Sequence, residues 1–132
     1  MSEPSSLALI LPAFDEEARL GPALDELFGY LGRRGEHARE GAPGAANLPA
    51  DIRVLVVDDG STDGTAALVT ARPEANGHAP AGTSLQLLSV PHGGKGAAVR
   101  AGMLAADADL IVFTDADMAT PPDQLPLLID AL

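Results

Sequence analysis

Hydrophobic residues along this chain gather into four short runs, separated by longer amphipathic or polar stretches. Short runs rich in Val, Ile and Leu are typical of strands that are buried on both faces of a parallel sheet. We therefore predict strands over residues 7–11, 52–57, 85–90 and 110–113. Pro12 should end the first strand, because proline cannot donate a hydrogen bond to a sheet.

The stretches between these runs have helical spacing or small, helix-compatible residues. After the first strand, five residues fall on one apolar face of a helix: Leu20, Leu24, Leu27, Phe28 and Leu31. Two more helices are predicted over 65–71 and 97–106, and Asp15 should cap the first helix. Strands that alternate with helices predict the α/β class: a mostly parallel, Rossmann-like sheet with helices on both faces.

Two stretches rich in Gly and Pro, about 32–50 and 72–84, show no apolar periodicity. We expect flexible surface loops there. The length of 132 residues suits one domain or part of a larger one. An uncovered edge of a parallel sheet would also favour self-association.

The charge balance excludes some partners. Eight Lys and Arg stand against 19 Asp and Glu, a formal net charge of −11, which opposes nucleic-acid binding. The chain has no Cys, its first residues do not form a signal peptide, and no apolar run reaches the roughly 20 residues that span a bilayer. We expect a cytoplasmic protein with no transmembrane segment in this chain.

Polar and glycine-rich clusters follow each predicted strand, at 12–17, 58–63, 92–96 and 115–117. In open parallel sheets, ligands bind beyond the carboxyl ends of the strands. Four clusters that converge on that edge predict one binding site.

The last cluster contains two carboxylates, Asp115 and Asp117, directly after a strand. Residues two apart in an extended chain face the same side, and two close acids repel unless a cation or several donors lie between them. A divalent metal that also binds phosphate is the simplest occupant. The alternative is a polar turn in which Asp117 caps the following segment.

Several common nucleotide and metal motifs are excluded by single residues. A P-loop fails because Ser89 stands at its first glycine and Gly96 follows the lysine. A dinucleotide-binding loop needs a glycine where Val99 stands. A calcium loop beginning at Asp59 would end at Thr70 rather than at the required glutamate.

A phosphatase that forms an aspartyl-phosphate remains as an alternative. Its strand ends in Asp-x-Asp-x-Thr, so Asp115 would be the nucleophile and Asp117 the acid. The fifth position here is Ala119, and Thr120 comes one residue later, which moves the hydroxyl out of register.

Together, four blocks of this sequence resemble the family 2 glycosyltransferases of GT-A fold. The blocks are Pro-Ala-Phe-Asp-Glu-Glu from Pro12, Val-Asp-Asp-Gly-Ser-Thr-Asp-Gly-Thr from Val57, Gly-Gly-Lys-Gly from Gly93, and Asp-Ala-Asp from Asp115. The endings Asp-Ala-Asp-x-Ala-Thr and Gly-Lys-Gly-x-Ala-Val-Arg are most similar to dolichyl- or polyprenyl-phosphate glucosyltransferases. Such enzymes supply lipid-linked sugars, including those of cell-envelope glycans.

The resemblance implies a role for each block. Pro12, Phe14 and Glu16 would line the pocket for the base and ribose. Asp59 would accept a hydrogen bond from the uracil N–H, a task suited to an ionised carboxylate. Lys95, in a glycine-rich turn at a helix N-terminus, would bind the diphosphate.

The resemblance also implies the metal and the substrates. Asp117 would bind Mg²⁺ or Mn²⁺, with Asp115 contacting the ribose or a metal-bound water, and the metal would act as a Lewis acid for the leaving diphosphate. The donor would be a nucleoside-diphosphate sugar, with UDP-glucose favoured. The acceptor would be a polyprenyl or dolichyl phosphate, so we expect the cytoplasmic face of a membrane as one location. Transfer to a saccharide or other small acceptor, and an inactive binding module, remain alternatives.

The sequence departs from the family pattern at two places. Asp15 replaces the usual Asn, which adds negative charge near the nucleotide. The chain ends at Leu132, where family members continue with the segments that bind the acceptor and supply the catalytic base. We therefore expect residues 1–132 to be the nucleotide-sugar-binding part of a longer transferase, with the base beyond Leu132.

Overall fold

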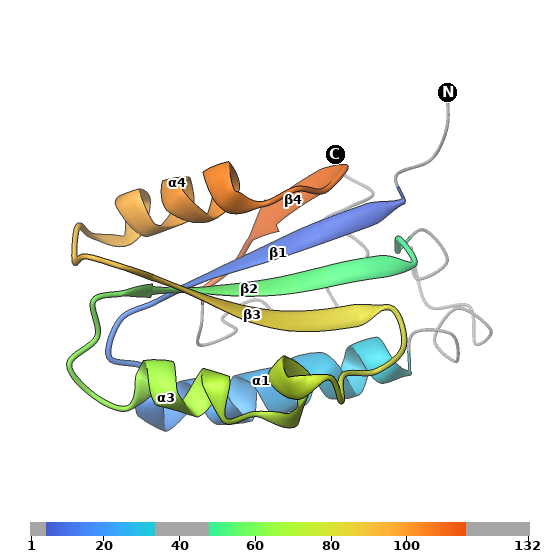
Figure 1. The fold of residues 1–132 in the computed structure, drawn as a ribbon, viewed down its shortest axis with the longest axis horizontal. Coiled ribbons are helices and arrows are strands. Elements are labelled where there is room, and N and C mark those ends of the chain that lie inside the picture. The colour runs from blue at the N-terminus through green and yellow to red at the C-terminus, as the bar shows by residue number, and fades with distance from the viewer. Residues whose placement is uncertain (1–4, 34–47, 116–132) are drawn as a thin grey trace.

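The computed structural model describes residues 5–33 and 48–115. Within these ranges the chain forms a four-stranded parallel sheet in the order β3-β2-β1-β4 (Figure 1). The strands are β1 (Ser6–Ala13), β2 (Asp51–Asp59), β3 (Thr83–Val90) and β4 (Leu110–Phe113). The predicted α/β class with a parallel sheet is confirmed.

Helices cover both faces of this sheet. The helices α1 (Glu17–Gly32) and α3 (Thr65–Thr70) lie on one face, and α4 (Lys95–Ala105) lies on the other (Figure 1). A short 3₁₀ helix, η2 (Pro73–Asn76), follows α3 within the segment where the sequence predicts a loop. Among the described residues, no helix is long and apolar enough to cross a bilayer.

The central strand β1 divides the hydrophobic core into two clusters. Leu7, Leu9 and Leu11 pack in the larger cluster with α1, whereas Ala8 and Ile10 pack in the smaller cluster with α4. This alternation follows from the two-residue repeat of a strand, which points successive side chains to opposite faces. All eight residues of β1 are buried, as the apolar run predicts for a strand with a layer on each side.

The predicted apolar face of the first helix is confirmed by burial. All five of its residues are buried in α1 and belong to the larger cluster. Burial of each such side chain contributes about 1.5–3 kcal/mol, so most of the stability of α1 comes from this face.

The helix α4 approaches the sheet through small residues. A Cβ at Gly102 would lie 2.6 Å from Ile10 Cγ2 and 3.0 Å from Val57 Cγ2, so only glycine allows this distance. Ala98, one turn earlier, is fully buried. The close contact fixes the N-terminal end of α4, which starts at Lys95, beside the carboxyl ends of β1 and β2.

Two predictions at the end of β1 are wrong. Pro12 lies inside the strand, paired with Val57. It is tolerated because the ladder between β1 and β4 is complete at Ile10, so Pro12 lies beyond the last β4 partner. The N-cap of α1 is Glu16 rather than Asp15, because Asp15 adopts a left-handed conformation, φ 51°, and turns its carboxylate to another loop.

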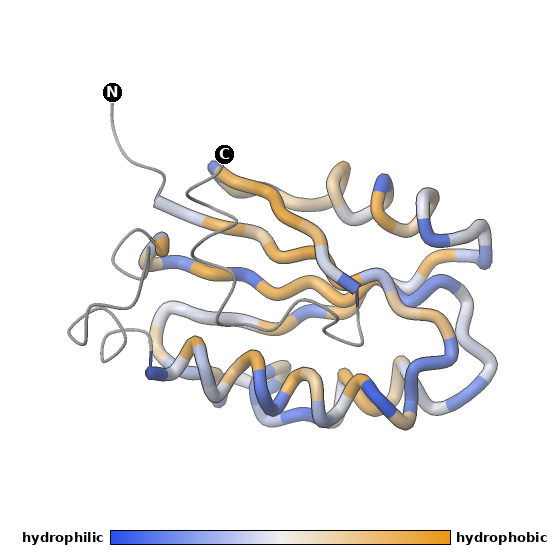
Figure 2. The backbone as a smooth tube through the Cα atoms, turned by 180° about the vertical axis from the view of Figure 1, so that it is seen from behind, coloured by the Kyte–Doolittle hydropathy of each residue, from blue (hydrophilic) through white to orange (hydrophobic). Residues whose placement is uncertain are grey.

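Other element boundaries differ from the predicted ones by one or two residues. The strand β2 continues to Asp59, so both acids of the Asp-Asp-Gly motif belong to the strand. The helix α4 starts at Lys95, two residues before the predicted start. The sheet is coloured mainly as hydrophobic and the turns beyond the carboxyl ends of the strands as more hydrophilic (Figure 2).

Candidate active site at the carboxyl edge of the sheet

A cavity of about 220 Å³ lies at the carboxyl ends of the strands, beside the start of α4. Its lining includes six of the seven residues that the sequence predicts for the nucleotide-sugar site: Pro12, Phe14, Glu16, Asp59, Lys95 and Asp115. Ala13 and Ala98 complete the lining. Asp117, the seventh, lies outside the described residues, so its position stays a prediction.

The loops after β1 and β2 are joined by hydrogen bonds across the edge of the sheet. The N–H of Asp15 donates to Ser61 Oγ at 2.9 Å, and the N–H of Thr62 donates to Asp15 Oδ1 at 2.8 Å. Aspartate is among the few residues that adopt the left-handed region readily. The side chain of Asp15 therefore serves loop geometry, and it is not among the residues that line the cavity.

A second set of hydrogen bonds fixes the start of α1. Asp63 accepts from the N–H of Glu17 at 3.3 Å and from the N–H of Thr65 at 2.9 Å, while Glu17 Oε2 accepts from the N–H of Gly64 at 3.1 Å. The N–H of Glu16 donates to Thr65 Oγ1 at 3.0 Å. The hydrogen bond from the Thr65 hydroxyl, more than any other contact, holds the pKa of Asp63 below its ordinary value.

Glu16 lines the cavity while its side chain stays largely covered. Its Oε2 lies 2.8 Å from Arg19 Nε, one turn along α1, and the side chain of Glu16 is 18% exposed. Glu16 therefore contributes a largely covered carboxylate to the lining of the cavity.

The two acids at the end of β2 have different partners. Asp58 is buried and its Oδ1 accepts from the N–H of Ser61 at 3.2 Å, which supports the turn. Asp59 is 3% exposed and reaches the turn before α4, where the N–H of Gly93 donates to Oδ1 at 2.8 Å and that of Gly94 to Oδ2 at 3.1 Å. Asp59 thus connects β2 to the segment that presents Lys95.

His92 was not predicted as a site residue, although its turn was. Its ring stacks on Phe14, with centroids 4.5 Å apart and planes at 29°. Its Nδ1 lies 3.0 Å from Asp59 Oδ2. Phe14 is 43% exposed, so an aromatic face remains open beside the cavity. The polar composition of residues 92–96 indicated a turn, but nothing local indicated this pair.

Lys95 and Asp115 provide opposite charges at the other side of the cavity. Lys95 Nζ forms an ion pair with Asp115 Oδ1, and the side chains are 59% and 46% exposed. Lys95 is the first residue of α4, after Gly94 with φ 97°. A lysine at a helix N-terminus, where free N–H groups also point outward, favours an anion such as a diphosphate.

Among the described residues, one carboxylate at the cavity, Asp115, is of the type that binds a hard divalent cation. Among the described residues, no three Asp, Glu, His or Cys side chains are grouped as a metal site. Asp115 is a partly exposed carboxylate whose present partner is the Lys95 ammonium, itself a cation. Mg²⁺ and Mn²⁺ are commonly held by one or two carboxylates together with substrate phosphates, so a complete protein cage is not required.

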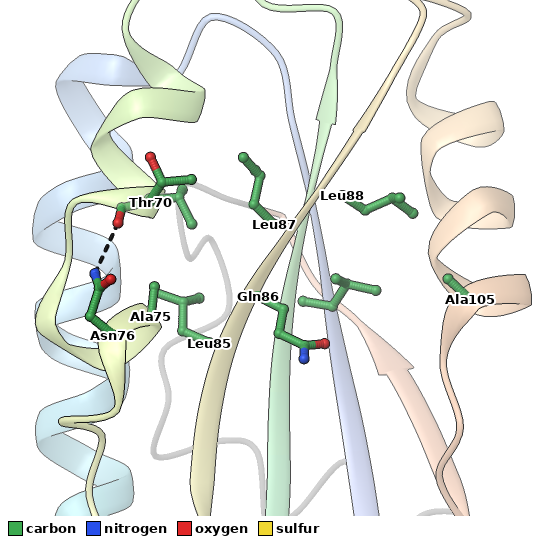
Figure 3. A pocket seen from close by; sticks show the side chains of 10 residues that line it. Thr70, Ala75, Asn76, Leu85, Gln86, Leu87, Leu88 and Ala105 are labelled. Atoms are coloured by element: carbon green, nitrogen blue, oxygen red, sulfur yellow. Dashed lines mark hydrogen bonds between the residues drawn. The ribbon is translucent and has the colours of Figure 1, made fainter.

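A larger cavity, about 590 Å³, lies along the edge strand β3 (Figure 3). Leu85 and Leu87 point toward α3 and η2, and Leu88 points toward α4 (Figure 3). The lining has no charged side chain, and its Asn76 donates to the carbonyl of Thr70 at 2.9 Å. This cavity therefore lacks groups for acid–base, metal or phosphate chemistry, and the smaller cavity is the candidate site.

Comparison with protein families gives one match over most of the chain. The model of the family described as Glycosyl transferase family 2 matches residues 8–132. A dolichyl-phosphate beta-glucosyltransferase of Trichomonas vaginalis is 38% identical over 116 residues, which are 87% of this chain and 30% of that protein. An undecaprenyl-phosphate 4-deoxy-4-formamido-L-arabinose transferase of Sodalis glossinidius is 30% identical over 124 residues, 94% of this chain and 32% of that protein.

A solved structure shares the fold. The mannosyltransferase PcManGT of Pyrobaculum calidifontis, in complex with GDP-Man and Mn²⁺, has a TM-score of 0.64 and 22% identity over 98% of this chain and 32% of that chain. This chain spans about a third of the length of the curated relatives it matches. The predicted resemblance is confirmed at the level of family and fold.

Proposed function

Because this chain belongs to glycosyl transferase family 2, we propose that it binds the donor in an inverting, metal-dependent glycosyltransferase. The donor is a nucleoside-diphosphate sugar, UDP-glucose in our proposal, and the acceptor is a polyprenyl or dolichyl phosphate. The reaction takes place at the cytoplasmic face of a membrane, where such an acceptor is available.

The observation that carries this proposal is the meeting of four chemical groups around one cavity. An exposed aromatic ring, a buried carboxylate, a lysine at a helix N-terminus and a partly exposed carboxylate lie at the carboxyl ends of four parallel strands or in the segments that follow them. These are Phe14, Asp59, Lys95 and Asp115. A sugar nucleotide needs groups of these kinds for its base, its diphosphate and a bridging cation.

The residues of the chain bind and orient the donor. Phe14 offers its face to the base, and Asp59 accepts from the base N–H. Lys95 and the N–H groups at the start of α4 neutralise the diphosphate as it departs with the additional negative charge. When a diphosphate binds, it competes with Asp115 for the Lys95 ammonium.

A bound Mg²⁺ or Mn²⁺, held by Asp115 and Asp117, would act as a Lewis acid for the leaving nucleoside diphosphate. The Mn²⁺ in the complex of PcManGT, which shares the fold, supports the proposal of a divalent metal. The names of the relatives, which refer to dolichyl phosphate and undecaprenyl phosphate, support a lipid-phosphate acceptor. An acceptor oxygen would attack the anomeric carbon as the bond to the diphosphate breaks, which inverts the configuration.

Calorimetry of UDP-glucose binding tests the donor site. We expect binding to require Mn²⁺ or Mg²⁺ and to weaken about tenfold or more in Asp115→Asn and Asp117→Ala, since each removes a charged ligand. Asp109→Ala, which removes an acid from the opposite edge of the sheet, is the matched control and should bind as the wild type does. An affinity for UDP-glucose that changes neither with the metal nor with either substitution would contradict the proposal.

Turnover separates the acceptor classes. The full product of the gene should transfer glucose to a polyprenyl phosphate in preference to a free saccharide. Preference for the saccharide would keep the donor site but reject the acceptor. A stable fluoroberyllate adduct on Asp115 would instead favour the phosphatase alternative.

A further inference from the structure

The ion pair between Lys95 and Asp115 joins two side chains to which the proposed function gives different ligands. Lys95 receives the diphosphate, and Asp115 receives the divalent cation. We propose that this ion pair is exchangeable and couples the two binding events. Lys95 competes with the metal for Asp115, and a diphosphate removes that competition because it binds the ammonium itself. The inference rests on the proposed donor site and adds to it a regulation of metal binding.

The charges around the cavity make this ion pair important. Among the described residues that line the cavity, Lys95 is the one cation, against the three carboxylates of Glu16, Asp59 and Asp115. A diphosphate that binds there brings further negative charge, so it needs Lys95 and an additional cation. A divalent metal held by a carboxylate and the phosphates supplies that cation.

Two of the three carboxylates have partners other than Lys95. Asp59 is 3% exposed and accepts two backbone N–H groups, and Glu16 pairs with Arg19. Asp115 is the carboxylate whose Oδ1 pairs with Lys95. An exchange of one cation for another at this cavity therefore takes place at Asp115.

The side chain of Lys95 can change partners without a change in the fold. The side chains of Lys95 and Asp115 are 59% and 46% exposed, and exposed ion pairs are weak. The backbone at the start of α4 is held separately, by the hydrogen bond from the N–H of Ala98 to the carbonyl of Gly94 at 3.0 Å. A lysine carries its charge on a flexible four-carbon chain, so its ammonium can move to an anion at the helix N-terminus.

The exchange predicts effects that change sign with the conditions. By linkage, a diphosphate and a metal that favour each other do so by the same factor. Direct contact between phosphate and metal gives some coupling in any such site, so coupling alone does not identify the exchange. Removal of Lys95 should strengthen Mn²⁺ binding without nucleotide, and removal of the Asp115 charge should strengthen UDP binding without metal. Each substitution should nevertheless weaken UDP binding in the presence of Mn²⁺.

The first measurement is Mn²⁺ binding without nucleotide by the wild type, Lys95→Met and Arg100→Met. Paramagnetic broadening of the amide NMR signals of Ala13 and Ala98, which line the cavity, separates this site from other acidic groups. We expect Lys95→Met to bind Mn²⁺ about two- to fivefold more tightly than the wild type, the range for loss of an exposed ion pair. Unchanged or weaker binding by Lys95→Met would overturn the inference.

Arg100→Met is the matched control for that substitution. It removes the same charge from the same helix, at a residue that does not line the cavity. Its effect on Mn²⁺ affinity should be smaller, because solvent and salt screen exposed charges that are not in contact. Equal gains in the two variants would assign the effect to net charge and would also overturn the inference.

The second measurement is UDP binding in EDTA, followed by phosphorus NMR at millimolar UDP. We expect Asp115→Asn to bind UDP about two- to fivefold more tightly than the wild type, because Lys95 no longer has a competing partner. In the Lys95→Met background, Asp115→Asn should give no such gain. An equal gain in both backgrounds would assign the effect to local charge and contradict the exchange. Thermal unfolding checks that each variant is folded.

The remaining outcomes separate this inference from the proposed function. Weaker UDP binding by Lys95→Met and Asp115→Asn with Mn²⁺, without a gain in either single-ligand experiment, would reject the exchange and keep the donor site. No binding of UDP by the wild type under any of these conditions would reject both.

Discussion

The two edges of the sheet are both acidic, yet only one of them forms a candidate site. At the amino edge, Asp109 accepts from the backbone N–H of Ser5 at 2.8 Å, and Arg53 pairs with Asp51 at 2.7 Å. At the carboxyl edge, Asp59 accepts from the backbone of a glycine turn. Acid content alone therefore does not distinguish a site from a surface.

The two edges differ in the partners of their acidic side chains and in how far these side chains are exposed. At the amino edge, Asp51 engages the cation beside it, and both side chains are more than 40% exposed. At the carboxyl edge, buried carboxylates are satisfied by backbone N–H groups of glycine-containing loops, which leaves Lys95 and Asp115 open to the cavity. Exposed ion pairs contribute little to stability, whereas buried, fully bonded carboxylates fix loop positions.

The largest effect is expected from substitution of Gly60, a glycine at the carboxyl edge of the sheet. In Gly60→Ala the new Cβ would lie 2.8 Å from the His92 backbone at a φ of 71°, so strain and overlap add. We expect a loss of about 2–5 kcal/mol of unfolding free energy and loss of nucleotide binding. Urea unfolding and calorimetry measure the two effects.

Gly77 provides the matched control for that substitution. It also has a positive φ, 87°, but nothing lies within 4 Å of a Cβ there. Gly77→Ala should therefore lower stability by only about 1–2 kcal/mol, from backbone strain, and should leave binding unchanged. Equal effects of the two substitutions would mean that the contact with His92 is not significant.

Asp59→Asn tests the buried carboxylate. The new amide would place a donor against the N–H groups of Gly93 and Gly94 or lose the charge that they bind. We expect about 1–3 kcal/mol of destabilisation and at least about tenfold weaker UDP binding. Asp51→Asn at the amino edge should change stability by less than about 1 kcal/mol and binding not at all. Similar losses of stability and of UDP binding in Asp59→Asn and Asp51→Asn would contradict the distinction between the two edges.

Lys95→Met tests the exposed cation at the start of α4. Removal of its ion pair with Asp115 should change stability by less than about 1 kcal/mol, because both side chains are exposed. Affinity for UDP should fall about tenfold through the lost contact with the diphosphate. Arg53→Met, which removes a cation from the amino edge, should leave that affinity unchanged. A stability loss without a binding loss in Lys95→Met would assign the lysine to structure alone.

Sequence reasoning succeeded where the controlling interactions are local. The strand β1 is buried on both faces and appears in the sequence as a continuous apolar run. The helix α1 is buried on one face, and its apolar residues recur every three to four positions in the sequence. The convergence of Pro12, Phe14 and Lys95 was predictable because parallel strands end at one edge.

Sequence reasoning failed where the partner is distant along the chain. Asp15 was assigned to the helix after it, but its carboxylate binds a backbone 47 residues away, which pulls it into the left-handed region. The stack of Phe14 on His92 and the hydrogen bond from Gly93 to Asp59 likewise join segments at the ends of different strands. No local pattern separates Asp109 from the acids of the opposite edge.

We expect the smallest effects from the two aspartates, one at each edge of the sheet, that make the stability of the protein depend on pH. Asp63 and Asp109 both have a pKa held below the ordinary value of 3.8, the first mainly by the Thr65 hydroxyl and the second mainly by the N–H of Ser5. A lowered pKa in the folded state stabilises the protein at every pH above the ordinary pKa, and this contribution is lost as the pH falls from there through the lower pKa of the folded state. Asp63→Asn and Asp109→Asn should each lower Tm at neutral pH and flatten its decline in acid, as thermal unfolding at several pH values would measure. Only Asp63→Asn should also weaken UDP binding, because Asp63 fixes the segment that begins with Glu16. Weaker UDP binding by Asp109→Asn would contradict the conclusion that only the carboxyl edge takes part in binding.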